Sequence, residues 1–295
     1  MRLPVWAVAL VLLMLARGGA AGTAARPGAP RDRAWFVGDF ESGTLAGWKA
    51  DVAGPGSARV VRTPARGGQH ALCIRLAPGD RALDKERAEL RLADRTLERR
   101  HGGQGREIWY GWSMLVPRDF AAAPDGFHIV GQWHHRPHRD SPSAPLRWVR
   151  GAPPLTLHLS GSSGATMLVL VAHAAPRPPA VTLATRAIDR GVWHDLILHV
   201  RWSTQSDSFV EAWLDGTPFT AGRVRRATLF TPVSTYLRLG LYRHKHGSTT
   251  NVLYYDEVRL GDSYAAVRPR GVARGLLARF SQGGLPCASS TSSHW

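Results

Sequence analysis

Three segments of the sequence alternate apolar residues with polar residues that could carry out chemistry. Because successive side chains of a β-strand point to opposite faces of the sheet, each segment predicts a strand with one apolar and one polar face. The apolar faces would pack inward, and the polar faces could bind a ligand. The polar faces hold Arg87, Glu89 and Arg91 in the first segment; His128, Val130, Gln132 and His134 in the second; and Tyr236, Arg238, Gly240, Tyr242 and His244 in the third.

On a single concave sheet, this set of arginine, glutamine, histidine and tyrosine side chains suits β-elimination at a uronic acid. The C5 proton of a uronate is weakly acidic because the neighbouring carboxylate is already negative. Arginine and glutamine can hydrogen-bond that carboxylate and stabilise the charge that develops on it. Tyrosine and histidine can supply the base that takes the proton and the acid that protonates the leaving glycosidic oxygen. Any one segment alone is also typical of a solvated strand face, and only the three together favour a site.

The elements that must position these residues are short strands separated by Gly, Pro, Asp and Asn, a pattern typical of all-β folds. About a dozen strands and almost no helix predict two packed antiparallel sheets. Asp215-Gly216 is a strong hairpin signal, and we expect a long loop over 139–154. The predicted strands are residues 70–76, 87–92, 108–116, 127–134, 155–160, 167–173, 193–202, 209–214, 236–244 and 252–260.

The two ends of the chain differ from this central part. Arg2, an apolar run and the small residues after it predict an export signal over residues 1–22. The run is shorter than the ~20 residues of a membrane span, so we expect a secreted protein with no membrane partner. Residues 23–34 predict a flexible leader, and 265–295 a basic, disordered tail. A single domain over 35–264 lies between them.

The composition is strongly basic, with a formal net charge of +16 and a pI near 11.2. Such a charge attracts polyanions, although an arginine-rich composition bias would produce it too. The export signal favours an acidic polysaccharide over nucleic acid, for which no binding motif is present. Cys73 and Cys287 are the two cysteines. An oxidising compartment permits a disulfide, and the sequence leaves their pairing open.

The three polar segments resemble the strand motifs of jelly-roll polysaccharide lyases, namely R-x-E-L-R, Q-(I/V)-H and Y-x-K-x-G-x-Y-x-Q. The chain has RAELR at 87–91, QWH at 132–134 and YLRLGLYRH at 236–244, in that order. The last motif is more similar to the heparin lyase I and glucuronan lyase group. Further stretches resemble that group at 39–48, 110–117, 191–203, 210–216 and 254–261. The resemblance implies a β-jelly roll, a concanavalin-like sandwich of two antiparallel sheets.

The resemblance also implies a role for each residue that matches a motif. Tyr242 would be the catalytic acid and could also be the base, and His134 would be the second proton-transfer group or a neutraliser of the carboxylate. Trp133, which alternation turns away from His134, is expected in the core. Arg87 would be the third catalytic residue, binding the uronate carboxylate. The implied substrate-binding residues are Gln132 on the same carboxylate, Glu89 as the ion-pair partner of Arg87 or Arg91, Arg91 itself, Arg238 in place of the usual lysine, and Arg243, His244 and Lys245 along the groove.

Jelly rolls of this kind often hold a structural calcium ion between their first and last strands. Asp39, Glu41 and Asp256 could supply the oxygen ligands that calcium prefers, although Asp39 and Glu41 would also suit a turn before Gly43. We expect at most this one ion, no organic cofactor and a monomer.

Two other functions share the predicted fold. A lectin-like module would bind carbohydrate without needing Tyr242 and His134 together. A glycoside hydrolase would need two carboxylates flanking the bond, and the predicted groove offers only Glu89. The sequence therefore favours a secreted lyase acting on a uronic-acid-containing polysaccharide, with the lectin-like module as the alternative.

Overall fold

The computed structural model describes residues 32–122, 126–136, 151–162, 165–173, 180–243, 248–270 and Cys287. The predicted export signal, most of the leader and most of the predicted loop at 139–154 lie outside these residues. No helix within the described ranges is long and apolar enough to cross a membrane.

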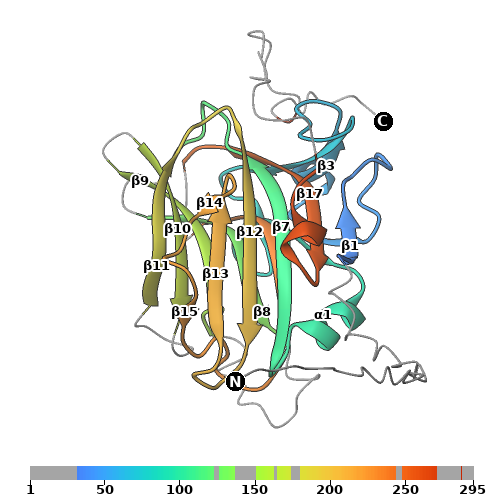
Figure 1. Ribbon diagram of the computed structural model, residues 1–295. Helices are drawn as coiled ribbons and strands as arrows, with labels where there is room; N and C mark the ends of the chain where they lie inside the picture. Colours follow the sequence, from blue (N-terminus) through green and yellow to red (C-terminus); the bar gives the residue numbers. More distant parts are fainter. Residues whose placement is uncertain are drawn as a thin grey trace, which may run out of the picture.

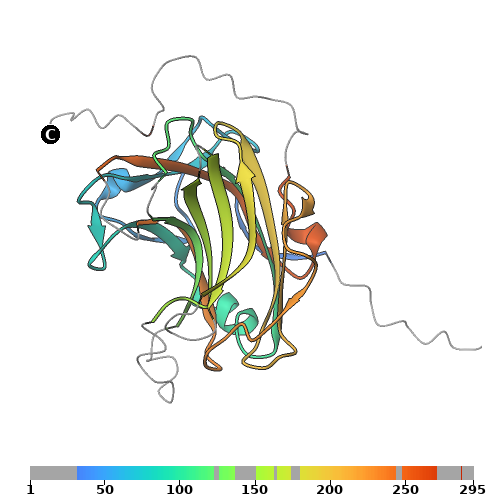
Figure 2. The same ribbon diagram turned by 90° about the vertical axis from the view of Figure 1, so that its left-hand side faces the viewer.

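Two antiparallel sheets pack as layers, which confirms the predicted jelly-roll class (Figure 1). Figure 2, turned by a quarter, shows that the long strands are curved. The nine-stranded sheet contains β1 (Ala34–Gly38), β3 (Ala58–Val61), β4 (Ala71–Leu76), β7 (Arg106–Leu115), β12 (Trp193–Trp202), β13 (Phe209–Leu214), β14 (Thr217–Pro218), β15 (Val224–Arg225) and β17 (Asn251–Gly261). The eight-stranded sheet contains β2 (Trp48–Asp51), β5 (Arg81–Ala82), β6 (Lys85–Leu92), β8 (His128–His135), β9 (Leu155–Ser162), β10 (Ala165–His173), β11 (Ala180–Ile188) and β16 (Thr235–Arg243).

The order of strands in the eight-stranded sheet is β11-β10-β9-β8-β16-β6-β2, with β5 paired to β6. The three segments predicted to carry chemistry are therefore neighbours, because β16 pairs with β6 on one side and with β8 on the other. Their apolar residues face the other sheet. Leu237, Leu239, Leu241 and Trp133 are all fully buried in the core, as alternation predicted.

An irregularity in β8 changes which of its residues face the core. The pairing of β8 with β9 shifts between Ile129 and Gly131, and its pairing with β16 shifts at the same level. An extra residue in one strand reverses the alternation beyond it. Ile129 consequently lies on the face of Gln132 and His134 and lines one cavity with them, whereas His128 and Val130 do not line it and Val130 packs in the core. The prediction that His128 and Val130 share a face with Gln132 and His134 is wrong.

The described residues also form three short helices: the 3-10 helix η1 (Pro55–Ser57), α1 (Arg95–His101) and α3 (Tyr264–Val267). Ala266 and Val267 of α3 are fully buried against the nine-stranded sheet. The described residues thus continue past the boundary predicted at 264, to 270, and most of the predicted tail lies outside them. Cys73 of β4 and Cys287 form a disulfide, with Cα atoms 6.3 Å apart, which answers the question that the sequence left open.

Candidate active site

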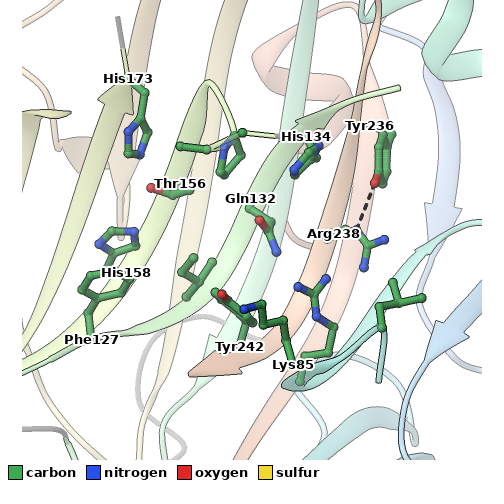
Figure 3. A pocket seen from close by; sticks show the side chains of 16 residues that line it. Lys85, Phe127, Gln132, His134, Thr156, His158, His173, Tyr236, Arg238 and Tyr242 are labelled. Carbon is green, nitrogen blue, oxygen red and sulfur yellow. Dashed lines mark hydrogen bonds between the residues drawn. The ribbon is translucent and has the colours of Figure 1, made fainter. Parts of the chain in front are cut away.

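A cavity of about 490 Å³ lies over the eight-stranded sheet and is called the groove here (Figure 3). Its side chains come from the polar faces of five neighbouring strands and from the turns between them. The described residues that line it are Leu83, Lys85, Arg87, Phe127, Ile129, Gln132, His134, Gly151, Ala152, Pro153, Thr156, His158, His173, Tyr236, Arg238 and Tyr242.

Strand register places the predicted catalytic residues in this groove. Tyr242 lies directly opposite Arg87 of β6, and the guanidinium carbon of Arg87 is 4.7 Å from the centre of the Tyr242 ring. On the other side of β16, Arg238 lies opposite Gln132 and Tyr236 opposite His134. Five of the predicted groups thus line one cavity, with Gln132 between His134 and Tyr242 in Figure 3.

Glu89 anchors the cationic side of the groove from below. It is 1% exposed, and its Oε2 accepts hydrogen bonds from Nη1 of Arg87 at 3.2 Å and from Nη1 of Arg238 at 3.3 Å. Its Oε1 accepts a hydrogen bond from Nε2 of Gln132. Because an amide nitrogen carries two N–H groups, Gln132 can donate one to Glu89 and the other to a ligand. Of its two predicted partners, Arg87 is the one that pairs with Glu89.

A second carboxylate completes this network at the edge of the sheet. Oδ2 of Asp51 lies 3.0 Å from Nη1 of Arg238 and 3.1 Å from Nε of Arg91. Arg91 therefore pairs with Asp51, and it is not one of the described residues that line the groove. Its predicted role in substrate binding becomes one of positioning Arg238 through Asp51.

The backbone beneath Arg238 and Tyr242 requires glycine. Gly240 has φ +145°, and a Cβ atom there would lie 2.2 Å from the carbonyl oxygen of Ala88. Only glycine adopts this conformation without strain and lets the two strands approach so closely.

His134 is a neutral imidazole in this setting. Burial lowers its pKa to about 4; the charges of Arg238 and Arg87 act in the same direction, and hydrogen bonds to the backbone of His135 and Gly151 oppose the shift. Nδ1 lies 3.2 Å from the carbonyl oxygen of His135. Since a carbonyl oxygen only accepts, Nδ1 carries the proton of the neutral ring, and Nε2 is the basic nitrogen.

Sequence reasoning missed the part of the groove over β9 and β10. Thr156 of β9 lies opposite Gln132 on the neighbouring strand β8. The rings of His158 and Phe127 stack, with 4.1 Å between their centres. His173 of β10 lines the same end. The alternation of Thr156 and His158 with three leucines in LTLHLS, residues 155–160, is the same signal as in the three segments of the sequence analysis.

A family model described as Polysaccharide lyase matches residues 40–259 of the chain. The chain belongs to this family. It is therefore a polysaccharide lyase, as the motifs predicted, and no curated protein sequence matches it significantly.

Solved structures show the same fold for this lyase. It is similar to the endo-β-1,4-glucuronan lyase of Trichoderma reesei, with a TM-score of 0.59 and 19% identity over 81% of this chain and 100% of that one. It is also similar to the family 7 alginate lyase A1-II′, with a TM-score of 0.55 and 14% identity over 77% of this chain and 99% of that one. A third similar structure is the catalytic domain of a glycoside hydrolase family 131 protein from Coprinopsis cinerea. Its TM-score is 0.56, with 14% identity over 81% of this chain and 98% of that one. Identities this low show the fold alone.

Arg243 of the lyase does not face the groove, contrary to prediction. It follows Tyr242 directly and so points to the opposite side of the sheet, where it is 4% exposed. There it pairs with Glu86 at 3.1 Å and donates to the carbonyl oxygen of Leu76 at 2.9 Å. His244 and Lys245, the remaining predicted groove residues, lie outside the described residues.

The three carboxylates predicted to bind calcium accept hydrogen bonds from backbone N–H groups. Asp39 accepts from Glu41, and Glu41 accepts from Gln69 and His70. Asp256 is fully buried and accepts from the backbone of residues 66, 67 and 257. No cluster of three or more such metal-ligating side chains occurs in the described part of the lyase. These three residues do not fit together as a ligand set, and calcium binding itself stays a prediction.

Proposed function

We propose that this polysaccharide lyase is secreted and cleaves a uronic-acid-containing polysaccharide by β-elimination, leaving a 4,5-unsaturated uronate end. The observation that carries the proposal is the content of the groove. Two guanidiniums, an amide, three imidazoles and two phenols line one cavity, and none of its described lining residues is a carboxylate. The apolar run at residues 5–16 supports secretion.

The residues divide the reaction between them as follows. Arg87, Arg238 and Gln132 bind the uronate carboxylate and stabilise the negative charge that builds up as the C5 proton leaves. His134 takes that proton, and the electrons of the C5–H bond form the C4=C5 double bond. The C4–O4 bond breaks, and the Tyr242 hydroxyl gives its proton to the leaving oxygen. Proton exchange with solvent restores both groups.

The test is a panel of acidic polymers incubated with the protein: glucuronan, alginate, pectate, heparin and heparan sulfate. The similarity in fold to a glucuronan lyase makes glucuronan the first candidate. We expect unsaturated product, seen as absorbance in the near ultraviolet, from at least one polymer. Binding without product would favour the lectin-like module.

Hydrolysis is the other reaction suggested by a structure of similar fold. It needs two carboxyl groups flanking the scissile bond. Glu89 is buried beneath the groove and bonded to Arg87, Arg238 and Gln132. It is therefore poorly placed to protonate a leaving group or activate water, and elimination is the better supported chemistry.

The low pKa of His134 predicts an unusual acid limb in the pH profile. As the base, His134 must be neutral, and it is protonated only as the pH falls through about 4. We therefore expect kcat/KM to stay high below pH 6, where an ordinary histidine of pKa ~6.5 would already be charged. The substrate carboxylates also titrate at low pH, so substrate binding to the Tyr242→Phe variant is measured at each pH as the control. An acid limb centred near 6.5, with unchanged binding, would show that His134 is not the half-buried base of low pKa described above.

A further inference from the structure

A two-residue turn between β5 and β6 has an unfavourable backbone conformation. Ala82 pairs with Lys85, so Leu83 and Asp84 alone form the turn. Their φ angles are +49° and +61°. Turns with two positive φ angles favour asparagine, aspartate and glycine, because a larger side chain clashes with its own backbone in this region. Aspartate suits this conformation, whereas leucine does not.

Leu83 also exposes an apolar side chain to solvent. It is 61% exposed, which is more than any other large hydrophobic residue in the described part of the chain. The other two exposed ones are Val37 and Val181, and neither lines the groove. Leu83 does line it. The residue thus combines a strained backbone with exposed apolar surface, at the rim of the active site.

The turn is held in place by contacts at its base. Nη2 of Arg81 donates to the carbonyl oxygen of Asp84 at 2.7 Å. The backbone N–H of Gly79 donates to Oε1 of Glu86 at 3.2 Å, and Oε2 of Glu86 pairs with the buried Arg243 at 3.1 Å. Arg243, which sequence reasoning placed in the groove, therefore anchors the hairpin that carries Leu83.

We propose that Leu83 is a substrate-contact residue, whose side chain packs on the apolar C–H face of a sugar ring bound in the groove. The inference rests on the proposed function. Strained residues persist where the surrounding structure fixes them, and they gather at ligand sites. Lys85 and Arg87 follow on the same hairpin and line the same cavity. The hairpin thus offers an acidic sugar an apolar contact beside two cations, which is the chemistry of a uronate ring with its carboxylate.

The test separates binding from stability with the Leu83→Asn variant. Asparagine fits the turn better, so we expect Tm to rise by about 3 °C. Loss of the apolar contact should raise KM about tenfold with kcat nearly unchanged, since burying much of a leucine side chain is worth about this factor. The substrate is the polymer of the panel that the wild-type protein cleaves fastest. A higher Tm excludes misfolding as the cause of the higher KM.

Two further variants control the result. Asp84→Gly changes the other turn residue, which does not line the groove, and should leave KM unchanged with Tm equal or higher. Leu83→Met keeps an apolar side chain and should keep KM within about twofold of the wild type. A wild-type KM in Leu83→Asn would overturn the role of Leu83 while leaving the lyase proposal intact. A wild-type protein that cleaves none of the polymers would overturn the proposed function, and this inference with it.

Discussion

Replacing Tyr242 with phenylalanine is expected to lower kcat about 1,000-fold and to leave Tm within about 2 °C of the wild type. The substitution removes only the hydroxyl that protonates the leaving oxygen. The ring stays and keeps its contact with the guanidinium of Arg87, 4.7 Å from the ring centre. Initial rates on the best polymer of the panel, together with a thermal unfolding curve, measure both quantities.

Tyr236 supplies the matched control for this result. It lines the same groove on the same strand, and its hydroxyl lies 3.4 Å from Nε of Arg238. Because we assign it no proton transfer, Tyr236→Phe should lower kcat less than about tenfold. Tyr236, not Tyr242, lies directly opposite His134 in the sheet. If Tyr236→Phe were the inactive variant and Tyr242→Phe the active one, the acid would be Tyr236 and our assignment would be wrong.

The second large effect is expected from Glu89→Gln. This change leaves the shape in place but removes the buried negative charge that Arg87 and Arg238 share at 3.2 and 3.3 Å. Asp51 then remains as the partner of Arg238, and Arg87 loses its ion pair with Glu89. Removing one partner of a buried ion pair costs about 3–5 kcal/mol of the free energy of unfolding. We also expect kcat/KM to fall about 100-fold, because Arg87 is no longer held against the carboxylate site and Arg238 keeps only Asp51 as its partner.

Urea unfolding measures the stability part of this prediction. Asp207→Asn is its control, because Asp207 pairs with Arg201 at 2.9 Å on the surface, where its side chain is 54% exposed. Exposed pairs contribute less than about 1 kcal/mol. Equal unfolding free energies for the two variants would show that Glu89 does not neutralise the groove cations as described.

Local alternation predicted the site residues of β6 and β16, two strands whose pairing with each other is regular. Arg87, Arg238 and Tyr242 line the groove as the pattern predicts, and Glu89 lies beneath them. Alternation also argued against Arg243 in the groove, because that residue adjoins Tyr242. The prediction for Arg243 followed its charge, and its burial beside Glu86 shows that the strand period was the better guide.

Features set by long-range pairing could not be read from the sequence. The shift in β8 that takes His128 off the face of Gln132 and His134 depends on how this strand meets β9 and β16. Asp51 joins the site only because β2 pairs with β6. The turn at Leu83 escaped notice for a different reason: Leu-Asp is not a sequence that favours two positive φ angles, and its neighbours impose that conformation.

The most direct test of the central claim counts products of two kinds in the same digest. Elimination creates one C4=C5 double bond for every new reducing end, whereas hydrolysis creates reducing ends alone. With the polymer that the protein cleaves fastest, we predict a ratio of one double bond, measured by near-ultraviolet absorbance, to one reducing end throughout the reaction. Reducing ends that accumulate without absorbance would contradict β-elimination and the roles assigned to Tyr242 and His134.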